Sequence, residues 1–484
     1  MERVNLLIGG RDVEATGGAT FSRNNPISGE VATVAAAASV KDAIAAVDAA
    51  AEAFPAWSAL GPSERRAKLA RAADLLESQA ARFVSILSHE TGATAGWTNF
   101  NVHLAAGMLR EAAAMTTQLS GEVMPSDIPG NLAMAIRQPV GVCLGIAPWN
   151  GPVILGVRAL AMPLACGNTV VLKASEICPA THRLIGTILH ESGIGAGVVN
   201  VITNEAKDSA AVVEAMIAHP AVRRINFTGS TNVGRSIAQV AAKHLKPVLL
   251  ELGGKAPLIV LDDADIDEAV NATVFGAFAN TGQVCMSTER VIVDEKVADE
   301  FAAKLAKRVA ALPSGDPRLG DVVLGSLAGR ASVDRVHKLV SDAVASGAKL
   351  LTGNTVVEGT LMPGLVVDHV TPAMTLFREE SFGPQVSITR VKSVDEAVRL
   401  ANDTEYGLAA AVFSRDIAKA LEIAKRLETG ICHINGPTLH DEAHMPFGGT
   451  KNSGYGRFGG KASLDHFTEL RWITIQTAPR HYPF

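Results

Sequence analysis

Cys285 is the residue of this sequence best suited to covalent chemistry. It lies in a short polar segment, Asn280 to Ser287, which contains Gly282 and follows an apolar helical pattern. A cysteine attacks as its thiolate, so it needs a lowered pKa or a nearby base, together with access to solvent. A small residue that fills a helix end is the alternative for a cysteine taken alone. The remaining cysteines lie in apolar sequence, where a thiol is expected to be inert: Cys143, Cys166, Cys178 and Cys432.

Glu251 is the second candidate, because it is a single carboxylate in the apolar strand end Leu249–Leu252. Burial disfavours the charged form of a carboxylate and raises its pKa toward that of a useful general base. Gly253 and Gly254 follow it, and residues without a side chain let another segment or a ligand approach closely. An ion pair with Lys255 or another cation is the alternative.

A possible phosphate site lies at Phe227–Gly234, which joins a predicted strand to a predicted helix. The backbone N–H groups at a helix N-terminus attract anions, and here they are joined by Gly229 and the hydroxyl of Ser230. The segment lacks a full GxGxxG pattern, so by itself it is a weak indication of nucleotide binding.

Together these segments resemble the aldehyde dehydrogenase superfamily, and the resemblance extends over essentially the whole chain. The family's Glu-Leu-Gly-Gly-Lys motif stands at Glu251–Lys255, and its cysteine motif at Gly282–Cys285. The segment Ile146–Asn150 is similar to the one whose asparagine, with the backbone N–H of the cysteine, holds the oxyanion of the tetrahedral intermediate. The resemblance therefore implies that Cys285 is the nucleophile, Glu251 the base for the hydrolytic water, and Asn150 an oxyanion donor.

The resemblance also implies a nicotinamide cofactor. Lys173 and Glu176 match residues that hold the adenosine ribose, and a carboxylate there favours NAD over NADP, which is the alternative. Glu380 and Phe382 match the residues beside the nicotinamide ribose. The full set of expected cofactor-binding residues is Ile146, Pro148, Trp149, Lys173, Glu176, Gly229, Ser230, Leu252, Gly253, Glu380 and Phe382.

The implied reaction oxidises an aldehyde to a carboxylate through a thiohemiacetal and a thioester at Cys285. The pattern is similar to the branch that acts on aromatic aldehydes, and salicylaldehyde is the preferred prediction. Vanillin, benzaldehyde and aliphatic aldehydes are the alternatives. The residues expected to contact the substrate are Trp97, Gly151, Ile154, Leu155, Arg158, Met286 and Phe447.

Several of these assignments have competing interpretations. Arg158 could stack on an aromatic ring or bond a ring oxygen, but it could equally pair with an acidic neighbour, and Trp97 could be ordinary core packing. Phe458 stands where many relatives carry a second glutamate, which puts proton relay through that position in doubt. The segment His440–His444 has metal-ligand residue types but no third ligand at suitable spacing, so a solvated loop and no metal are predicted.

The elements that must position these residues alternate in type. The pattern from Val40 to about Gln118 is helical, with a break at Pro55 and Pro62 and a new helix capped by Ser63. Strands are then predicted at 133–147, 168–173, 198–203, 222–228, 248–250 and 385–391, and helices at 152–165, 179–192, 209–219, 232–244, 267–280, 298–311 and 328–346. This alternation predicts a parallel, doubly wound sheet whose ligand lies beyond the carboxyl ends of the strands, where Pro148–Gly151, Lys173–Glu176 and Gly229–Gly234 should converge.

The predicted fold is therefore α/β, with a Rossmann-type parallel-sheet cofactor domain, an α/β catalytic domain and a small β element for oligomerisation. The expected boundaries are 1–118 and 140–251 for the cofactor domain, 252–460 for the catalytic domain, and 119–139 with 461–484 for the oligomerisation strands. Unpaired strands of this kind are liabilities unless a partner covers them, so a homodimer is expected, with a tetramer as the alternative.

Composition excludes several classes of protein. The chain has 484 residues, a formal charge of −5 and no basic stripe, which argues against nucleic acid as a partner. No signal-length apolar run and no membrane-length apolar stretch is present, so a cytoplasmic location without membrane contact is expected. Two alternatives keep the fold: release of the thioester to coenzyme A instead of water, and a non-catalytic structural or binding protein.

Overall fold

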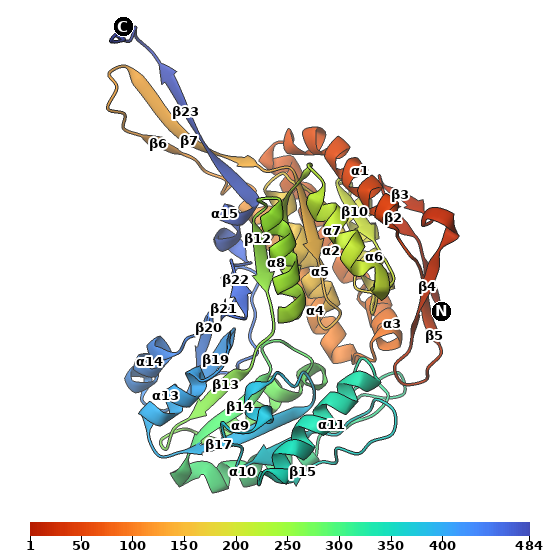
Figure 1. The fold of residues 1–484 in the computed structure, drawn as a ribbon, viewed down its shortest axis with the longest axis vertical. Coiled ribbons are helices and arrows are strands. Elements are labelled where there is room, and N and C mark those ends of the chain that lie inside the picture. The colour runs from red at the N-terminus through yellow and green to blue at the C-terminus, as the bar shows by residue number, and fades with distance from the viewer.

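The computed structural model describes all 484 residues and arranges them around two large sheets, with a narrow sheet projecting from one end (Figure 1). The first large sheet has parallel strands at its centre and antiparallel strands at both edges. Its order is β22 (Gly454–Tyr455), β12 (Val248–Glu251), β11 (Val222–Thr228), β8 (Val142–Ile146), β9 (Thr169–Lys173), β10 (Val199–Ile202), β2 (Leu6–Ile8) and β3 (Arg11–Val13).

Helices cover both faces of this sheet because its central strands are apolar on both sides. On β9, for example, Val171 packs with α1, α7 and α8, whereas Val170 and Leu172 pack with α5, α6 and the N-terminal helices. The predicted doubly wound arrangement is confirmed. The helices of this half are α1 (Val40–Ser58), α2 (Pro62–Ser78), α3 (Ala80–Glu90), α4 (Ala95–Met115), α5 (Pro152–Ala165), α6 (Pro179–Glu191), α7 (Ser209–Ala218) and α8 (Thr231–Lys243).

The second large sheet is also parallel, except for one edge strand. Its order is β15 (Lys349–Thr352), β16 (Leu365–Asp368), β17 (Gln385–Val391), β14 (Thr288–Asp294), β13 (Ala256–Val260), β19 (Ala409–Phe413) and β20 (Ile431–Ile434). The helices around it are α9 (Ile266–Phe278), α10 (Glu295–Ala310), α11 (Arg330–Ala345), α12 (Thr375–Arg378), α13 (Val394–Asn402) and α14 (Ile417–Arg426).

Smaller elements complete the fold. β22 joins the first sheet although the expected boundary at residue 460 groups it with the second. The projecting sheet has the order β23 (Thr468–Gln476), β7 (Asn131–Pro139) and β6 (Glu122–Met124), and α15 (Leu464–Phe467) precedes it. The remaining strands are β1 (Glu2–Val4), β5 (Val31–Ala36) and β4 (Thr20–Asn24) in one sheet, and β18 (Tyr406–Gly407) with β21 (Thr450–Lys451) in another.

Two predicted boundaries in the helical layer are wrong. α1 does not break at Pro55 but runs on to Ser58, because the proline removes only the one hydrogen bond that its own N–H would donate to Ala51, and the helix ends three residues later. Ser63 does not cap the next helix. α2 begins at Pro62, whose fixed φ suits a first helical position, and Gly61 precedes it without a side-chain cap.

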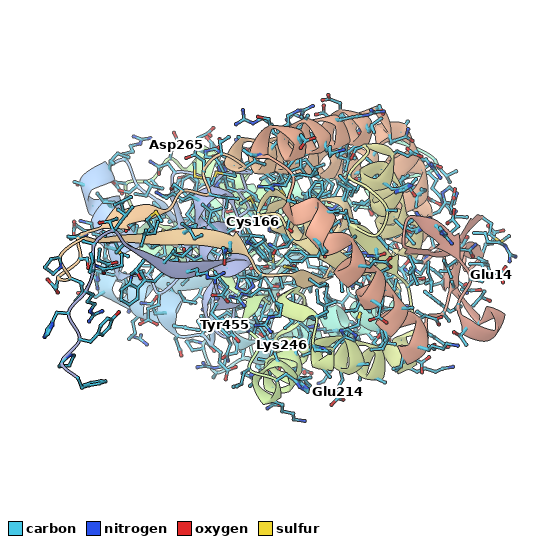
Figure 2. All side chains as sticks on the ribbon, turned by 90° about the horizontal axis from the view of Figure 1, so that it is seen from above. Glu14, Cys166, Glu214, Lys246, Asp265 and Tyr455 are labelled. Carbon is cyan, nitrogen blue, oxygen red and sulfur yellow. The ribbon has the colours of Figure 1, made fainter.

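The strand predicted over 133–147 is two strands in different sheets. β7 ends at Pro139, which has no N–H to continue a ladder, and Gly141 has a φ of 129°, which turns the chain into β8. In the view from above, β7 and β23 extend to one side of the body, while the labelled Cys166 lies toward its centre (Figure 2). None of the helices combines the length and the apolar composition that crossing a membrane requires.

Candidate active site

The chain reaches Cys285 through a strained turn. α9 ends at Phe278, two residues earlier than predicted, and Asn280 and Thr281 then adopt φ values of 49° and 57°. Gly282 continues this left-handed run, and a Cβ there would lie 2.1 Å from the carbonyl oxygen of Gly383. Left-handed non-glycine residues cost about 1–3 kcal/mol each and are found mainly where function fixes the backbone.

Gln283 holds this turn in place. Its side-chain nitrogen donates to the carbonyl oxygens of Asn280 (3.1 Å) and Ser326 (3.2 Å), and its side-chain oxygen accepts from the backbone N–H of Ala328 (2.9 Å). The thiol of Cys285 is thereby presented from a rigid loop, half-buried, at the floor of a cavity of about 270 Å³.

Glu251 lies directly beside this thiol. The Cys285 Sγ is 3.8 Å from the Glu251 Oε2, and the carboxylate is fully buried at the end of β12. The approach depends on Gly254, because a Cβ at that position would lie 2.3 Å from the carbonyl oxygen of Cys285. The glycines after Glu251 thus allow the close approach of another segment, as predicted. Lys255 does not pair with Glu251 but with Glu289.

Burial controls the protonation of both groups. It raises the pKa of Glu251 to about 8, with a smaller opposing contribution from the Arg158 charge. Burial, followed by the Glu251 charge, raises the pKa of Cys285 well above its ordinary value. The thiol is therefore not activated by a lowered pKa, and a base must take its proton. The Oε1 of Glu251 has no hydrogen-bond partner, which leaves it free to accept one.

Asn150 faces the same cavity. Its side-chain nitrogen donates to the Gln283 carbonyl oxygen at 3.1 Å, so one of its two N–H bonds is used to hold its orientation. The backbone carbonyl oxygen of Asn150 accepts hydrogen bonds from Trp97 Nε1 and from Asn280 Nδ2, each at 2.9 Å. Trp97 therefore supports the Asn150 backbone.

A second cavity, of about 540 Å³, shares several lining residues with the first. The strand ends of β8, β9 and β11 meet there, as expected for a parallel sheet. Lys173 Nζ lies 3.6 Å from Glu176 Oε2, and Glu214 adds a second carboxylate that the sequence did not indicate. Predicted cofactor residues that line one or both cavities are Ile146, Pro148, Trp149, Lys173, Glu176, Gly229, Ser230, Leu252, Gly253, Glu380 and Phe382.

Glu380 is fixed against the segment that follows Glu251. Its Oε1 accepts from the backbone N–H of Gly254 at 2.9 Å, and a Cβ at Gly253 would lie 2.7 Å from its Oε2. Phe382 has a φ of 52°, and its ring meets that of Trp149 edge-on, with centroids 5.8 Å apart. These contacts bring the two predicted cofactor segments together.

Besides Glu214, sequence reasoning missed three further charged residues of the site. Arg335, on α11, lines the cavity beside Glu380, and its charge opposes the rise of the Glu380 pKa. Glu289 accepts from the backbone N–H groups of Ser381 (2.9 Å) and Phe382 (3.1 Å) and pairs with Lys255. A charged residue inside the apolar strand 288–294 was the signal that could have revealed Glu289.

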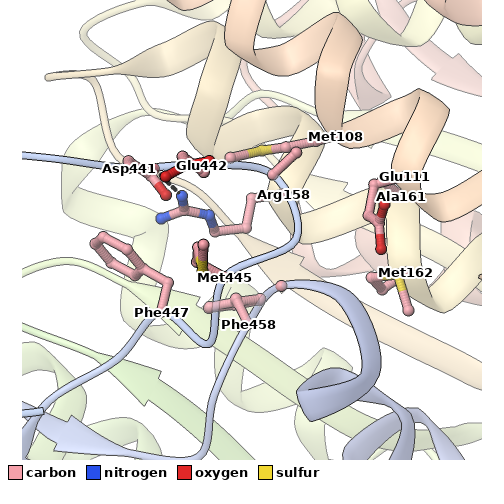
Figure 3. Close-up of a pocket in the computed structure, with 12 residues that line it drawn as sticks. Met108, Glu111, Arg158, Ala161, Met162, Asp441, Glu442, Met445, Phe447 and Phe458 are labelled. Atoms are coloured by element: carbon pink, nitrogen blue, oxygen red, sulfur yellow. Dashed lines mark hydrogen bonds and ion pairs between the residues drawn. The ribbon is translucent and has the colours of Figure 1, made fainter. Parts of the chain in front are cut away.

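Asp441 is the third, and here the prediction of a solvated loop at His440–His444 is partly wrong. His440, Glu442 and His444 are exposed, but the Asp441 side chain is only 6% exposed because it pairs with Arg158 inside the protein (Figure 3). Arg158 thus pairs with an acidic neighbour, one of its two predicted alternatives.

Aromatic side chains surround this pair. The Arg158 Cζ lies 4.1 Å from the Phe447 ring centroid and 5.8 Å from that of Phe458, which is an arrangement for cation–π attraction. The backbones of Phe447 and Phe458 bond each other in both directions. The pair and both rings line a cavity of about 20 Å³.

The other predicted substrate residues do not line this cavity. Ile154, Leu155 and Met286 are buried in the same apolar cluster as Phe447, and Cys285 packs against that cluster. At Gly151 a Cβ would meet Asn101 Oδ1 at 3.4 Å and Leu155 at 3.7 Å, so a small side chain would fit there.

Comparison with known proteins identifies the family. The model of the aldehyde dehydrogenase family matches residues 13–473. The chain is 61% identical to a vanillin dehydrogenase of Pseudomonas sp. strain HR199 and 50% identical to a salicylaldehyde dehydrogenase of Pseudomonas putida, each over 100% of both chains. A crystal structure of a salicylaldehyde dehydrogenase from Pseudomonas putida, complexed with salicylaldehyde, has a TM-score of 0.98 and 49% identity, with 100% of both chains covered.

The chain belongs to the aldehyde dehydrogenase family. The predicted family, its α/β fold and an NAD(P)-dependent aldehyde dehydrogenase as the class of enzyme are confirmed.

Proposed function

We propose that this chain oxidises an aromatic aldehyde to its carboxylic acid, with Cys285 as the nucleophile, Glu251 as the base and NAD as the hydride acceptor. The observation that carries the proposal is the 3.8 Å contact between the Cys285 thiol and the buried Glu251 carboxylate, in a cavity that Asn150 also lines. A thiol, a base and an amide donor around one space are the parts that acyl chemistry needs.

In the first half of the reaction, Glu251 takes the thiol proton and the Cys285 sulfur bonds to the carbonyl carbon. The free N–H of the Asn150 amide and the backbone N–H of Cys285 donate to the oxygen that becomes negative. A bound nicotinamide ring supplies the acceptor for the hydride that leaves this carbon. The product of these steps is a thioester at Cys285.

In the second half, water attacks the thioester carbon and the sulfur leaves. Glu251, once it has lost its proton, accepts one from the attacking water through the oxygen that has no partner in the structure. The carboxylic acid is released and Cys285 regains its starting form. The same carboxylate serves both halves, so its pKa near 8 sets the pH at which each proceeds.

The residues present fit a dinucleotide. The N-terminus of α8 follows Gly229 and Ser230, and its free N–H groups suit a pyrophosphate. Glu176 would accept a hydrogen bond from a ribose hydroxyl, and with Glu214 it would repel a phosphate in that place, which supports NAD over NADP. Glu380 and Arg335 would contact the ribose next to the nicotinamide and its phosphate.

The proposal of an aromatic substrate is supported by the rings of Phe447 and Phe458 near the buried Arg158 and by the activities named for the relatives. Salicylaldehyde was the substrate preferred from the sequence. The 61% identity to a vanillin dehydrogenase makes vanillin an equally strong candidate.

We also propose the division into a cofactor domain, a catalytic domain and oligomerisation strands, with a homodimer or tetramer formed through the projecting sheet. Exposed apolar side chains on β23 support this, since Leu470 and Trp472 are 61% and 72% exposed.

The proposal is tested by NADH formation with purified protein, NAD and a panel of vanillin, salicylaldehyde, benzaldehyde and hexanal. We expect higher kcat/KM on the aromatic aldehydes, no activity in Cys285→Ala, and product formation that does not require coenzyme A. Better turnover of hexanal would contradict the aromatic assignment, and activity in Cys285→Ala would remove Cys285 as the nucleophile.

A further inference from the structure

The buried pair of Arg158 and Asp441 leaves hydrogen-bonding capacity unused. Oδ2 of Asp441 accepts from Arg158 Nη2, but Oδ1 is fully buried and has no partner. A buried carboxylate oxygen without a donor is costly, so a native structure rarely keeps one without a reason. This oxygen belongs to a residue that lines the cavity of about 20 Å³ (Figure 3).

The lining of this cavity can yield to a larger guest. About 20 Å³ holds a water molecule but not an aromatic ring. Met108, Met162 and Met445 form part of the wall, and methionine side chains are flexible enough to take another rotamer. The rigid parts of the wall are Phe447 and Phe458, which would flank a flat ring.

The position of the Arg158–Asp441 pair relative to Cys285 determines which part of a substrate bound at Cys285 can reach Asp441. Arg158 lies six residues along α5 from Pro152, about 9 Å from the helix end next to Asn150. Thr438, three residues before Asp441, donates to the carbonyl oxygen of Met286, the neighbour of Cys285 (2.7 Å). Both paths place the pair on the Cys285 side of the fold, and the charges of Arg158 and Asp441 both act on the pKa of that thiol.

We propose that Asp441 is a specificity-determining residue that accepts a hydrogen bond from a hydroxyl group on the substrate ring, para to the aldehyde. This inference rests on the proposed function and narrows it to 4-hydroxybenzaldehydes. An ortho hydroxyl lies next to the reacting carbonyl and cannot reach Asp441. Burial raises the pKa of Asp441, and the charge and hydrogen bond of Arg158 oppose that rise. In the ion pair with Arg158 the carboxylate acts as an acceptor, and the phenol donates its proton to the hydrogen bond.

The test compares kcat/KM of the wild-type enzyme for 4-hydroxybenzaldehyde, 4-methoxybenzaldehyde and unsubstituted benzaldehyde. Hydroxy and methoxy groups donate electrons to the ring to a similar extent, so the carbonyl groups have similar reactivity, but only the hydroxyl can donate a hydrogen bond. We expect the hydroxy compound to be preferred over the methoxy compound by at least about tenfold. In 2-hydroxybenzaldehyde and 2-methoxybenzaldehyde the ratio should stay within about threefold.

Asp441→Ala should reduce the para preference to about twofold while benzaldehyde kcat/KM changes by less than about fivefold. His444→Ala, at an exposed residue of the same loop that does not line the cavity, is the control and should keep the wild-type ratio. If the alanine variant does not fold, Asp441→Leu replaces it, because leucine has a similar volume and no acceptor, and the wild-type ratios stand in either case. Equal wild-type kcat/KM for 4-hydroxybenzaldehyde and 4-methoxybenzaldehyde would mean that Oδ1 binds only water. That result would overturn the inference but leave the aromatic function intact. A para preference unchanged in the variant would overturn the role of Asp441, whereas inactivity on every benzaldehyde would overturn the proposed function itself.

Discussion

Glu251 and Cys285 affect each other's protonation at the residue scale. The carboxylate and the thiol are 3.8 Å apart in a buried place. Burial and then the Glu251 charge raise the pKa of Cys285, whereas burial raises the pKa of Glu251 and the hydrogen bond from the thiol partly offsets that rise. Below about pH 8 each group therefore holds its own proton, and Glu251 must lose its proton to solvent before it can accept one.

The pH dependence of turnover follows from that arrangement. Because burial raises the pKa of Glu251 to about 8, the base is protonated below that pH and ionised above it, so kcat should rise with pH through about 8. Glu251→Gln should lower kcat at least about 100-fold and remove this inflection. Steady-state rates of the wild type and the variant from pH 6 to pH 10 measure both the loss of kcat and the position of the inflection. An unchanged inflection in the variant would assign the titration to another group.

We expect the choice between NAD and NADP to depend strongly on Glu176. The Glu176 carboxylate is 34% exposed at the ribose end of the cleft, where its charge acts on a 2′-phosphate through partly screened surroundings. Glu176→Gln should lower the KM for NADP by about tenfold, with a smaller effect on NAD. Glu191→Gln, at an exposed carboxylate that ends α6 and does not line that cavity, is the control. Equal KM changes for both cofactors would show that Glu176 does not discriminate them.

Elements explain which parts of the site the sequence could reveal. β11, β17 and α5 were predicted to the residue. A long apolar run defines α5, whereas β-branched and aromatic residues next to Gly229 and to Gly383–Pro384 define the two strands. The roles that depend on local motifs, such as those of Cys285 and Glu251, could be proposed from one segment.

What could not be predicted depends on contacts between distant segments. Asp441 meets Arg158 across 283 positions of sequence, and Glu289 meets the loop at Ser381 across 92. No local period or propensity encodes such a pairing, and a charged residue in a loop is ordinarily solvated. For this reason Asp441 was expected on the surface, and Glu289 and Arg335 were not singled out.

The loop that carries Glu380 offers a test of such a long-range contact. Glu289 accepts from two backbone N–H groups of this loop, and Lys255 balances its charge inside the protein. Glu289→Ala should raise the KM for NAD at least about tenfold while the KM for the aldehyde changes little, since the loop faces the cofactor side.

The matched variant for that measurement is Glu289→Gln, which keeps an acceptor for the backbone N–H groups and should retain most of the affinity for NAD. Calorimetric titration with NAD measures the affinity of each variant for NAD directly. Thermal unfolding reports a separate effect, the loss of folding stability when Lys255 is left unpaired, which should be about 3–5 kcal/mol. Equal losses of NAD and aldehyde affinity would indicate general damage instead of a positioned loop.

The whole molecule assembles one site from two sheets. Asn150 follows β8 and Glu251 ends β12 in the first sheet, whereas Cys285 precedes β14 and Glu380 precedes β17 in the second. Neither half holds the proposed nucleophile together with its proposed base, so a change in the relative position of the sheets would separate the two. The contacts that fix the two sheets relative to each other are therefore needed to keep Cys285 beside Glu251.

The projecting sheet gives the last prediction. β23 pairs with β7 over nine residue pairs but has no strand on its other edge, and Leu470, Trp472 and Ile475 are exposed. A free edge with apolar side chains is a ready site for pairing with another chain. The double variant Leu470→Lys with Trp472→Lys should therefore shift the protein from an oligomer to a monomer in light scattering. Leu245→Lys, at a leucine that is 92% exposed outside this sheet, should leave the mass unchanged. A wild-type monomer, or an oligomer that survives the double variant, would contradict association through this sheet.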